Sequence, residues 1–428
     1  MHLLRLALAV ALASLPVPAQ DDDPRQRARM ARDLGRQGSS AIERLQPMLS
    51  DTHLEVRLEA VKALVEIGTQ HSLAPLIEAT RDVDPEIQIR ATDGLVNFYL
   101  PGYVQSGLTA SIRRAGSRIT AMFTDNNDAI VPAFVEVRPD VIEALGKLAR
   151  GGMTMESRAN AARAVGVLRG KAAIPDLIEA LHSKDDQVIY ESLIALQKIR
   201  DPEAAPRIAF LLRDFKEKVQ IAAIETTGLL QNKEALPDLR NVLERSRSKR
   251  VQRAALTAIA MLPDESSRRT YTTYFTDRDD GLRAAAAEGF ARLGNTEDIP
   301  MIEKAFNEER KMNPRLSMAF ALVALGKTEI SEFSPLRYLV NTLNSRSWRG
   351  IANPFLVELA RKDEIRKTLH TVVPEATKDE KIGLAQVLAK SGDQESLAVL
   401  DKLTLDADAE VAQEALRATR TLKTLRGL

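Results

Sequence analysis

Cysteine is absent from the 428-residue sequence, and histidine is scarce. Without cysteine the chain has no disulfide, no thiolate metal site and no cysteine nucleophile. The histidines are far apart, and none belongs to a His-Glu dipeptide or to an H-E-x-x-H motif; they are His2, His53, His71, His182 and His370. The sequence therefore predicts no metal site, no cofactor and no catalytic residue.

Aromatic residues and an excess of charge of one sign are also lacking. Aromatics make up 4% of the residues and hydrophobic residues 44%, with many alanines and leucines. That composition suits packed helix pairs better than the core of a globular enzyme. The 60 basic and 59 acidic residues nearly balance, so no overall charge attracts nucleic acid or an anionic membrane.

A helical pattern of the form V-R-x-x-A-x-x-A-L-G-x-x-G returns along the chain. Its copies, aligned on their first residue, begin at Val56, Ile87, Ser157, Val188, Val219, Val251, Leu282, Pro314, Trp348, Glu380 and Val411. The copies lie 31 or 32 residues apart, except for intervals of 70 residues before Ser157 and 34 before Trp348. A fixed period of this length predicts stacked supersecondary units.

Each copy is preceded by a second helical segment. Pro175, Pro206 and Pro237 recur at 31-residue intervals there, and proline is tolerated in the first turn of a helix. In the copy itself alanine recurs in one register, at Ala60, Ala91, Ala161, Ala223, Ala255, Ala286, Ala319, Ala352 and Ala415. These small side chains let helices approach closely, and Gly68, Gly294 and Gly326 are placed to end the helix. The predicted unit is an antiparallel helical hairpin.

The segments AAIPDLIEALHSKDDQVIYESLIALQKIRD and DGLRAAAAEGFARLGNTEDIPMIEKAF resemble HEAT repeats of the short bacterial, phycobilisome-lyase-like type. The resemblance covers roughly 24–99 and 139–425. It implies an all-α HEAT/armadillo-type α-solenoid, a fold that serves as scaffold, inhibitor or transport adaptor and, rarely, as an enzyme. The enzymes of this type are deoxyhypusine hydroxylases, whose di-iron site uses His-Glu dipeptides absent here, and phycobilin lyases.

The first residues follow a different pattern. Arg5 precedes an apolar run from Leu6 to Leu15, and Val17-Pro18-Ala19 leads into the acidic residues that follow Gln20. This pattern predicts a secretory signal peptide over 1–19, cleaved after Ala19. The apolar run is too short to span about 30 Å of hydrocarbon. We therefore expect an exported, periplasmic or extracellular bacterial protein.

The repeat lapses between Leu100 and Pro139. We expect an extra helix from Gln105 to about Phe123, followed by an extended stretch with alternating Val131, Ala133, Val135 and Val137. Aromatic residues gather in and beside this insertion, and Tyr99, Tyr103, Phe123 and Phe134 are candidate partner-binding residues. Insertions in repeat proteins often take part in binding. The alternative is that these rings pack against neighbouring helices and cover a discontinuity in the stack.

A basic turn gives a second candidate surface. Arg245, Arg247, Lys249 and Arg250 lie close together in the sequence, with Arg240 and Arg253 on either side. Such a group could bind an acidic partner or a phosphate, and the alternative is an ordinary solvated turn.

These patterns predict a signal peptide at 1–19, repeats over 20–99, an aromatic-rich insertion at 100–139 and repeats over 140–428, with about 11–12 hairpins in all. The predicted function is a non-catalytic protein–protein interaction scaffold or assembly module, with another protein as partner. The alternatives are a HEAT-type enzyme, lyase-like or metal-dependent and hydroxylase-like, and a structural spacer of an envelope complex.

Overall fold

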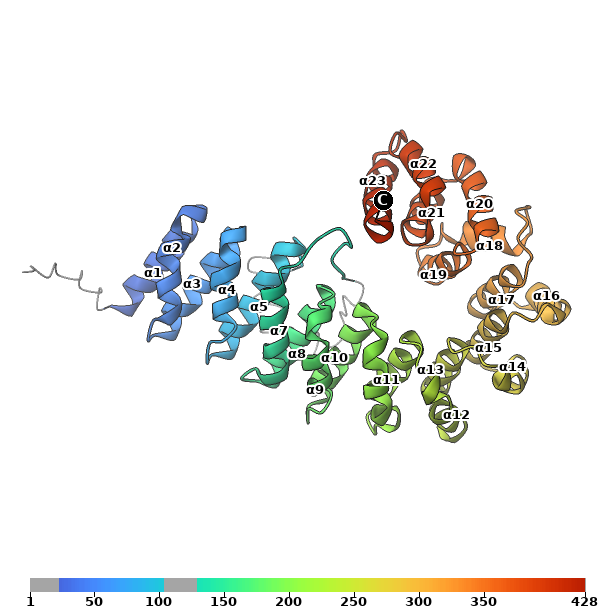
Figure 1. Ribbon diagram of the computed structural model, residues 1–428, viewed down its shortest axis with the longest axis horizontal. Coiled ribbons are helices and arrows are strands. Elements are labelled where there is room, and N and C mark those ends of the chain that lie inside the picture. Colours follow the sequence, from blue (N-terminus) through green and yellow to red (C-terminus); the bar gives the residue numbers. More distant parts are fainter. Residues whose placement is uncertain (1–22, 104–128, 428) are drawn as a thin grey trace, which may run out of the picture. The chain divides into compact units, whose positions relative to one another are not determined.

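The computed structural model describes residues 23–103 and 129–427. Over these ranges the chain is built of α-helices and short 3-10 helices, with no β-strand, as predicted for an all-α solenoid. It divides into two compact units, Met1–Phe98 and Tyr99–Leu428. Figure 1 shows the helices of each unit in the order of the sequence.

In the first unit, helix pairs begin directly after a leading helix. The α-helices are α1 (Pro24–Gly35), α2 (Ile42–Leu45), α3 (Leu54–Ile67), α4 (Leu73–Ala79) and α5 (Pro85–Tyr99), the last of which ends at the unit boundary. The 3-10 helices are η1 (Gly38–Ala41), η2 (Gln46–Ser50) and η3 (Gln70–Ser72). Because 3-10 turns precede α2 and α4, the outer helix of each pair is shorter than its inner partner.

The second unit continues the same alternation. Its first α-helices are α7 (Pro139–Gly151), α8 (Met155–Val167), α9 (Ile174–Ala180), α10 (Asp186–Ile199), α11 (Glu217–Leu229), α12 (Leu236–Arg245), α13 (Lys249–Ala260), α14 (Arg268–Tyr274) and α15 (Asp280–Leu293). The later ones are α16 (Ile299–Glu308), α17 (Met312–Ala324), α18 (Pro335–Thr342), α19 (Arg349–Leu359), α20 (Asp363–Val372), α21 (Lys378–Ser391), α22 (Gln394–Leu403) and α23 (Ala409–Arg426). The 3-10 helices are η4 (Lys171–Ala173), η5 (Pro202–Arg213), η6 (Lys233–Ala235), η7 (Glu265–Ser267), η8 (Thr296–Asp298) and η9 (Val373–Glu375).

The 31-residue period confirms the hairpin as the repeating unit. All but one of the aligned residues lie in the first turn of the second helix of a pair. The exception is Trp348, which is the N-cap of α19 rather than part of it. Gly68, Gly294 and Gly326 follow second helices with positive φ angles, so they end these helices as predicted.

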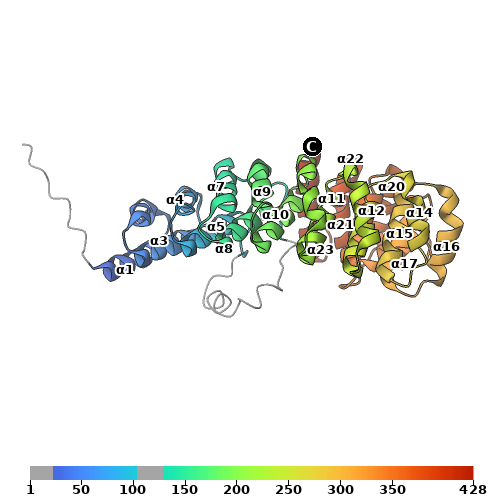
Figure 2. The ribbon, with the colours of Figure 1, turned by 90° about the horizontal axis from the view of Figure 1, so that it is seen from below.

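The second helices form a continuous layer in the second unit. Each packs on the second helix of the next repeat, from α8 and α10 to α21 and α23 (Figure 2). Ala223 and Ala286 are fully buried in this layer. A Cβ atom added to Gly166 would lie 2.7 Å from the Ala195 Cα atom, and one added to Gly228 would lie 2.9 Å from the Ala258 Cα atom. Small residues are therefore required where these helices meet.

The residue after each aligned position fixes the turn that precedes its own helix. Arginine and glutamine side chains donate to backbone carbonyls there: Arg57 to Asp51 at 3.0 Å, Gln88 to Asp82 at 2.8 Å, Gln220 to Leu212 at 2.9 Å, Gln252 to Ser246 at 2.9 Å and Arg283 to Asp277 at 2.8 Å. A turn between two helices has carbonyls that no helical N–H reaches, so these donors replace the missing partners.

The cations at this position also join one repeat to the next. In the first unit, Arg57 Nε lies 2.7 Å from Asp82 Oδ2. In the second unit, Arg283 Nε lies 2.8 Å from Glu309 Oε2, and Lys381 Nζ lies 2.7 Å from Asp406 Oδ2. Each carboxylate belongs to the turn of the following repeat. We call these contacts the inter-repeat ladder.

One outer helix departs from the predicted form. Pro175 and Pro237 are the second residues of α9 and α12, as their spacing predicted. Pro206 lies instead inside η5, which remains a 3-10 helix over its whole length of 12 residues. Because Pro206 has no N–H to donate, it removes one hydrogen bond that an α-helix would need at this place.

The connection before α7 corrects two sequence predictions. Residues 129–138 form no strand; the Val135 N–H donates to the Pro132 carbonyl at 3.0 Å, so a turn interrupts the alternating valines. The Val131 N–H donates to the Val167 carbonyl at 2.8 Å, which ties the segment to the end of α8. Pro139 belongs to α7 as its first residue rather than to the insertion. The helix predicted from Gln105 lies outside the described residues.

Buried arginine–carboxylate pairs predict sensitivity to acid. Hydrogen bonding to Arg27 lowers the pKa of Asp51, and hydrogen bonding to Arg253 lowers the pKa of Asp279. A carboxylate whose pKa is lower in the folded state contributes stability above its unfolded-state pKa of about 4, and loses it as the pH falls through the folded-state value. We expect the urea midpoint, followed by circular dichroism, to fall below about pH 4. A double variant R253Q/D279N should fall less steeply, and an identical slope would contradict the contribution of this pair.

Candidate functional site

Among residues 23–103 and 129–427, no group of three or more histidine, aspartate or glutamate side chains is placed to hold a metal ion. The histidines in these ranges have separate contacts. His182 stacks on Phe210 with ring centroids 4.8 Å apart, and His370 Nε2 lies 2.9 Å from Ser396 Oγ. The structure therefore brings no two histidines together into a catalytic or metal-binding arrangement in its described part.

The aromatic candidates have different surroundings. Tyr99 is 9% exposed, and its hydroxyl accepts a hydrogen bond from the Arg138 N–H at 3.1 Å. This contact supports the packing alternative for Tyr99. Tyr103 and Phe134 are half-buried, and Phe123 lies outside the described residues. Their part in partner binding stays a prediction.

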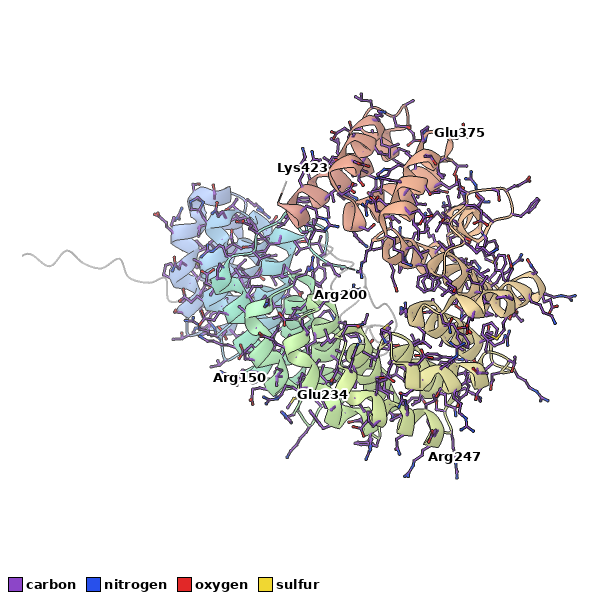
Figure 3. The ribbon with its side chains drawn as sticks, turned by 45° about the vertical axis from the view of Figure 1, so that its right-hand side comes forward. Arg150, Arg200, Glu234, Arg247, Glu375 and Lys423 are labelled. Carbon is purple, nitrogen blue, oxygen red and sulfur yellow. The ribbon has the colours of Figure 1, made fainter. Side chains whose placement is uncertain are left out.

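The basic turn joins α12 to α13. Arg245, Arg247, Lys249 and Arg250 are all exposed, and Figure 3 shows Arg247 on the outer side of the second unit. Arg250 Nη1 lies 3.1 Å from Glu217 Oε1 of the preceding repeat. The other three have no ion pair with any described residue, so their charges are available to a partner.

The two flanking arginines have structural contacts instead. Arg253 binds Asp279 through Nε at 2.7 Å and through Nη2 at 2.6 Å, and is part of the inter-repeat contacts. Arg240 Nη2 donates to Ser266 Oγ at 2.6 Å and to Ser267 Oγ at 2.9 Å. The sequence cluster of six cations thus contains three that are not committed to contacts within the described chain.

A charged network on the second helices was not predicted. Arg292 of α15 binds Glu358 of α19 through Nε at 2.9 Å and Nη2 at 2.8 Å, and lies 3.2 Å from Glu288 of its own helix. Ser317 of α17 donates to Glu288 at 3.2 Å. We call these four residues the Arg292 network. It connects three repeats through side chains that the sequence places 66 residues apart.

Burial sets the charge state in the Arg292 network. Removal from water raises the pKa of Glu288, and the adjacent Arg292 opposes that shift. The Arg292 guanidinium also lies 5.2 Å from the centre of the Phe320 ring, which stacks on Phe355 at 4.5 Å. The donors of Arg292 are used within the protein, so the network holds helices together and has no free group for a substrate.

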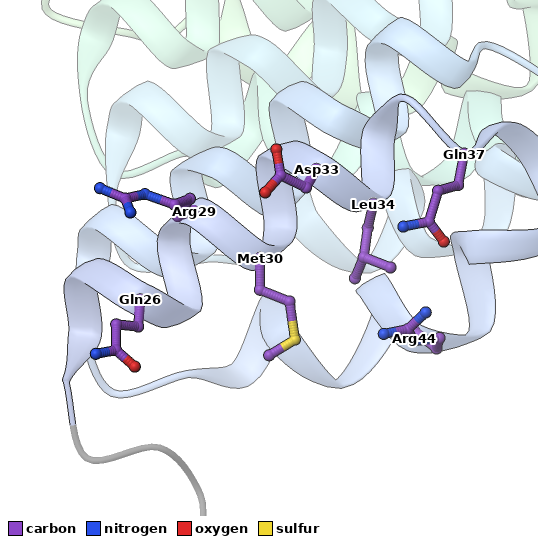
Figure 4. Close-up of a pocket in the computed structure, with 7 residues that line it drawn as sticks. All are labelled: Gln26, Arg29, Met30, Asp33, Leu34, Gln37 and Arg44. Atoms are coloured by element: carbon purple, nitrogen blue, oxygen red, sulfur yellow. The ribbon is translucent and has the colours of Figure 1, made fainter.

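A surface hollow of about 390 Å³ lies in the first unit between α1 and α2. Figure 4 shows Met30 and Leu34 at its floor, with Arg29, Asp33 and Arg44 around it. Asp33 is paired with Arg36 at 3.2 Å. The lining has one carboxylate and no histidine or hydroxyl group, so it contains no pair of groups suited to acid–base or nucleophilic catalysis.

Within the described residues, no helix is both long and apolar enough to cross a membrane.

A model of HEAT repeats matches residues 15–96, 142–214, 205–270 and 236–323, which together are more than half of the chain. The chain is a HEAT-repeat protein. The family model thus agrees with the hairpins that the structure shows, and the predicted fold class is confirmed.

The HEAT-repeat protein is similar in sequence to two named relatives. It is 36% identical over 110 residues to the bilin biosynthesis protein PecE of Nostoc sp. strain PCC 7120, covering 26% of this chain and 43% of that protein. It is 33% identical over 147 residues to PecE of Mastigocladus laminosus, covering 34% of this chain and 54% of that protein. The chain thus spans about half the length of the relatives that it matches. These relatives support the phycobilisome-lyase-like type that the sequence predicted.

Solved structures show likeness in fold alone. The complex of CpcE and CpcF of phycocyanin lyase from Nostoc sp. PCC7120 matches with a TM-score of 0.37 and 19% identity, covering 61% of this chain and 90% of that chain. Human deoxyhypusine hydroxylase in complex with glycerol matches with a TM-score of 0.29 and 18% identity, covering 67% of this chain and 96% of that chain.

Proposed function

We propose that this HEAT-repeat protein is an exported interaction scaffold or assembly module that binds another protein. The observation that carries the proposal is the basic turn, where Arg245, Arg247 and Lys249 are exposed and have no ion pair with any described residue. Elsewhere on the stack, arginines such as Arg253 and Arg283 are bound to carboxylates of the next repeat. Charges that the fold does not use are suited to steer and orient an acidic partner.

A second candidate function follows from the sequence relatives. Both are named bilin biosynthesis proteins, so a lyase-like role in which this chain handles a bilin is the alternative. Visible absorption of a free linear tetrapyrrole, measured with and without the purified protein, discriminates the two. A stoichiometric spectral change would favour the lyase-like role, and an unchanged spectrum favours the scaffold.

The experiment that tests the scaffold is partner capture from the envelope fraction of the source cells, with partners identified by mass spectrometry and the complex rebuilt from purified components. The triple variant R245A/R247A/K249A should lose most of the captured partner. A matched variant, R207A/R278A, removes exposed arginines from other outer positions and should capture normally. A second variant, Y103A/F123A, tests the insertion, and should weaken capture without lowering the melting temperature. Rebuilding no stoichiometric complex would refute the scaffold.

Export gives a prediction of its own. If residues 1–19 are a cleaved signal peptide, the native protein begins at Gln20. Intact mass spectrometry of protein isolated from the source cells should give the mass of 20–428. A native mass that includes Met1 would refute export by cleavage, while the interaction scaffold would still stand.

A further inference from the structure

Two arginines end neighbouring second helices in a backbone conformation that favours glycine. Arg169 follows α8 with a φ of 53°, and Arg200 follows α10 with a φ of 58°. At the corresponding place other repeats have glycine, with a φ of 55° at Gly68 and 77° at Gly294. A side chain with a Cβ atom is disfavoured in this left-handed region, so an arginine there costs stability that a glycine would not.

A third residue in the same series shows how that cost can be offset. Gln231 follows α11 with a φ of 59°, and its side-chain amide donates to the carbonyls of Gly228 at 3.2 Å and Met261 at 2.9 Å. Arg169 and Arg200 are exposed, and neither side chain has a hydrogen bond or an ion pair with the described residues. Unlike Gln231, they make no contact within this part of the chain that offsets their backbone conformation.

Further cations of the second unit act on Arg200. The surrounding protein, and then the charges of Arg169 and Arg361, lower the pKa of Arg200. The surrounding protein and the charge of Arg200 lower the pKa of Lys390, against the opposing effect of Glu414. We call Arg169, Arg200, Arg361 and Lys390 the inner cation cluster, since Figure 3 shows Arg200 on the inner side of the second unit, opposite Arg150 and Arg247.

The four members of the inner cation cluster share a position in the fold. Arg169, Arg200 and Arg361 follow the ends of α8, α10 and α19, and Lys390 lies in the last turn of α21. The partial negative charge at a helix C-terminus favours a cation there and reduces the repulsion between them. It supplies no counter-ion. No described carboxylate lies within ion-pair distance of any of the four, in contrast to the paired cations of the inter-repeat ladder.

We propose that the inner cation cluster binds an extended acidic segment of the partner protein, an inference that rests on the scaffold function proposed above. Neighbouring second helices pack about 8–10 Å apart, so successive cations repeat at about that spacing. In an extended peptide three residues span about 10 Å. Glutamate or aspartate at every third position therefore matches the series that begins with Arg169 and Arg200. The balanced net charge of the chain gives no long-range attraction for nucleic acid, which favours a peptide.

The test uses the mature full-length protein and a labelled peptide of about twelve residues made of Gly-Ser-Glu repeats, with binding read by fluorescence anisotropy. We expect saturable binding at about 50 mM salt and weaker binding at about 300 mM. The variant R169Q/R200Q should bind about tenfold or more weakly. The control variant R207Q/R278Q, which removes two exposed outer arginines, should bind like the wild type. A Gly-Ser-Gln peptide should not bind, and a peptide with its glutamates in one block should bind more weakly.

The variant R169G/R200G keeps the test falsifiable if the cations have a structural role. Glycine suits the left-handed conformation, so this variant should lose peptide binding while its melting temperature is unchanged or raised. Equal peptide affinity in R169Q/R200Q and wild type would overturn the proposal. So would loss of binding that occurs only together with a lowered melting temperature in both double variants. If the peptide does not bind but the envelope partner is still captured, this inference fails and the scaffold function stands.

Discussion

Replacing Arg292 with alanine is expected to lower the free energy of unfolding of the second unit by about 3–5 kcal/mol, because it leaves a buried carboxylate without its cation. Glu288 would keep one hydrogen bond, from Ser317, and Glu358 would lose both of its bonds to Arg292. The Arg292 side chain is 15% exposed, so water can restore little of what is lost. Urea denaturation followed by circular dichroism measures the change.

The matched control for Arg292 is Arg213. Its Nη2 lies 2.7 Å from Asp238 Oδ1, as short as the contact of Arg292 with Glu358, but the two side chains are 67% and 45% exposed. An exposed pair is worth about 0–1 kcal/mol, so R213A should change the urea midpoint little. Equal shifts in R292A and R213A would show that burial of the Arg292 network does not matter.

Replacing Tyr271 with alanine should cost about 3–5 kcal/mol, because it removes a fully buried ring from between two repeats. Tyr271 is 0% exposed, and its ring contacts Phe290 edge-on with centroids 5.9 Å apart. Gly289 gives the ring its space, since a Cβ atom there would lie 2.5 Å from the ring. The cavity left by alanine would separate α14 from α15.

Hydrogen exchange can locate the damage in Y271A. In a solenoid each repeat contacts its neighbours, so protection should fall in α14, α15 and the adjacent helices and much less in α21 and α23. The control Y271F removes the hydroxyl that donates to the Ile259 carbonyl at 3.1 Å and should cost about 1 kcal/mol. A uniform loss of protection along the second unit would argue against coupling between neighbours.

The sequence predicted the repeating part of this fold well because the period comes from local requirements. Proline in the first turn, alanine at helix contacts and glycine after the helix each act within one hairpin or between adjacent hairpins. The misplaced residues lie where the spacing changes: Trp348 follows the 34-residue interval and caps α19 instead of entering it. The alternating valines of 131–137 suggested a strand, but a turn at Pro132 prevents continuous pairing.

The Arg292 network and the inner cation cluster could not be found in this way. Arg292 meets Glu358 because the stack brings α15 and α19 together, and no local pattern encodes a contact over 66 residues. The positive φ angles of Arg169 and Arg200 contradict the usual preference for glycine, so a pattern based on glycine passes over them. A sharper signal was present: both arginines stand where the motif expects its second glycine.

The inter-repeat ladder has a consequence for how such a chain changes length over generations. Arg57 and Asp82 are 25 residues apart, Arg283 and Glu309 are 26 apart, and each pair crosses one repeat boundary. A repeat that contains both an acceptor in its turn and a cation in its second helix is a complete module. Duplication of such a module inserts one new acceptor and one new cation together, and deletion removes them together. Genetic gain or loss of whole repeats therefore leaves no cation of the ladder facing an empty place.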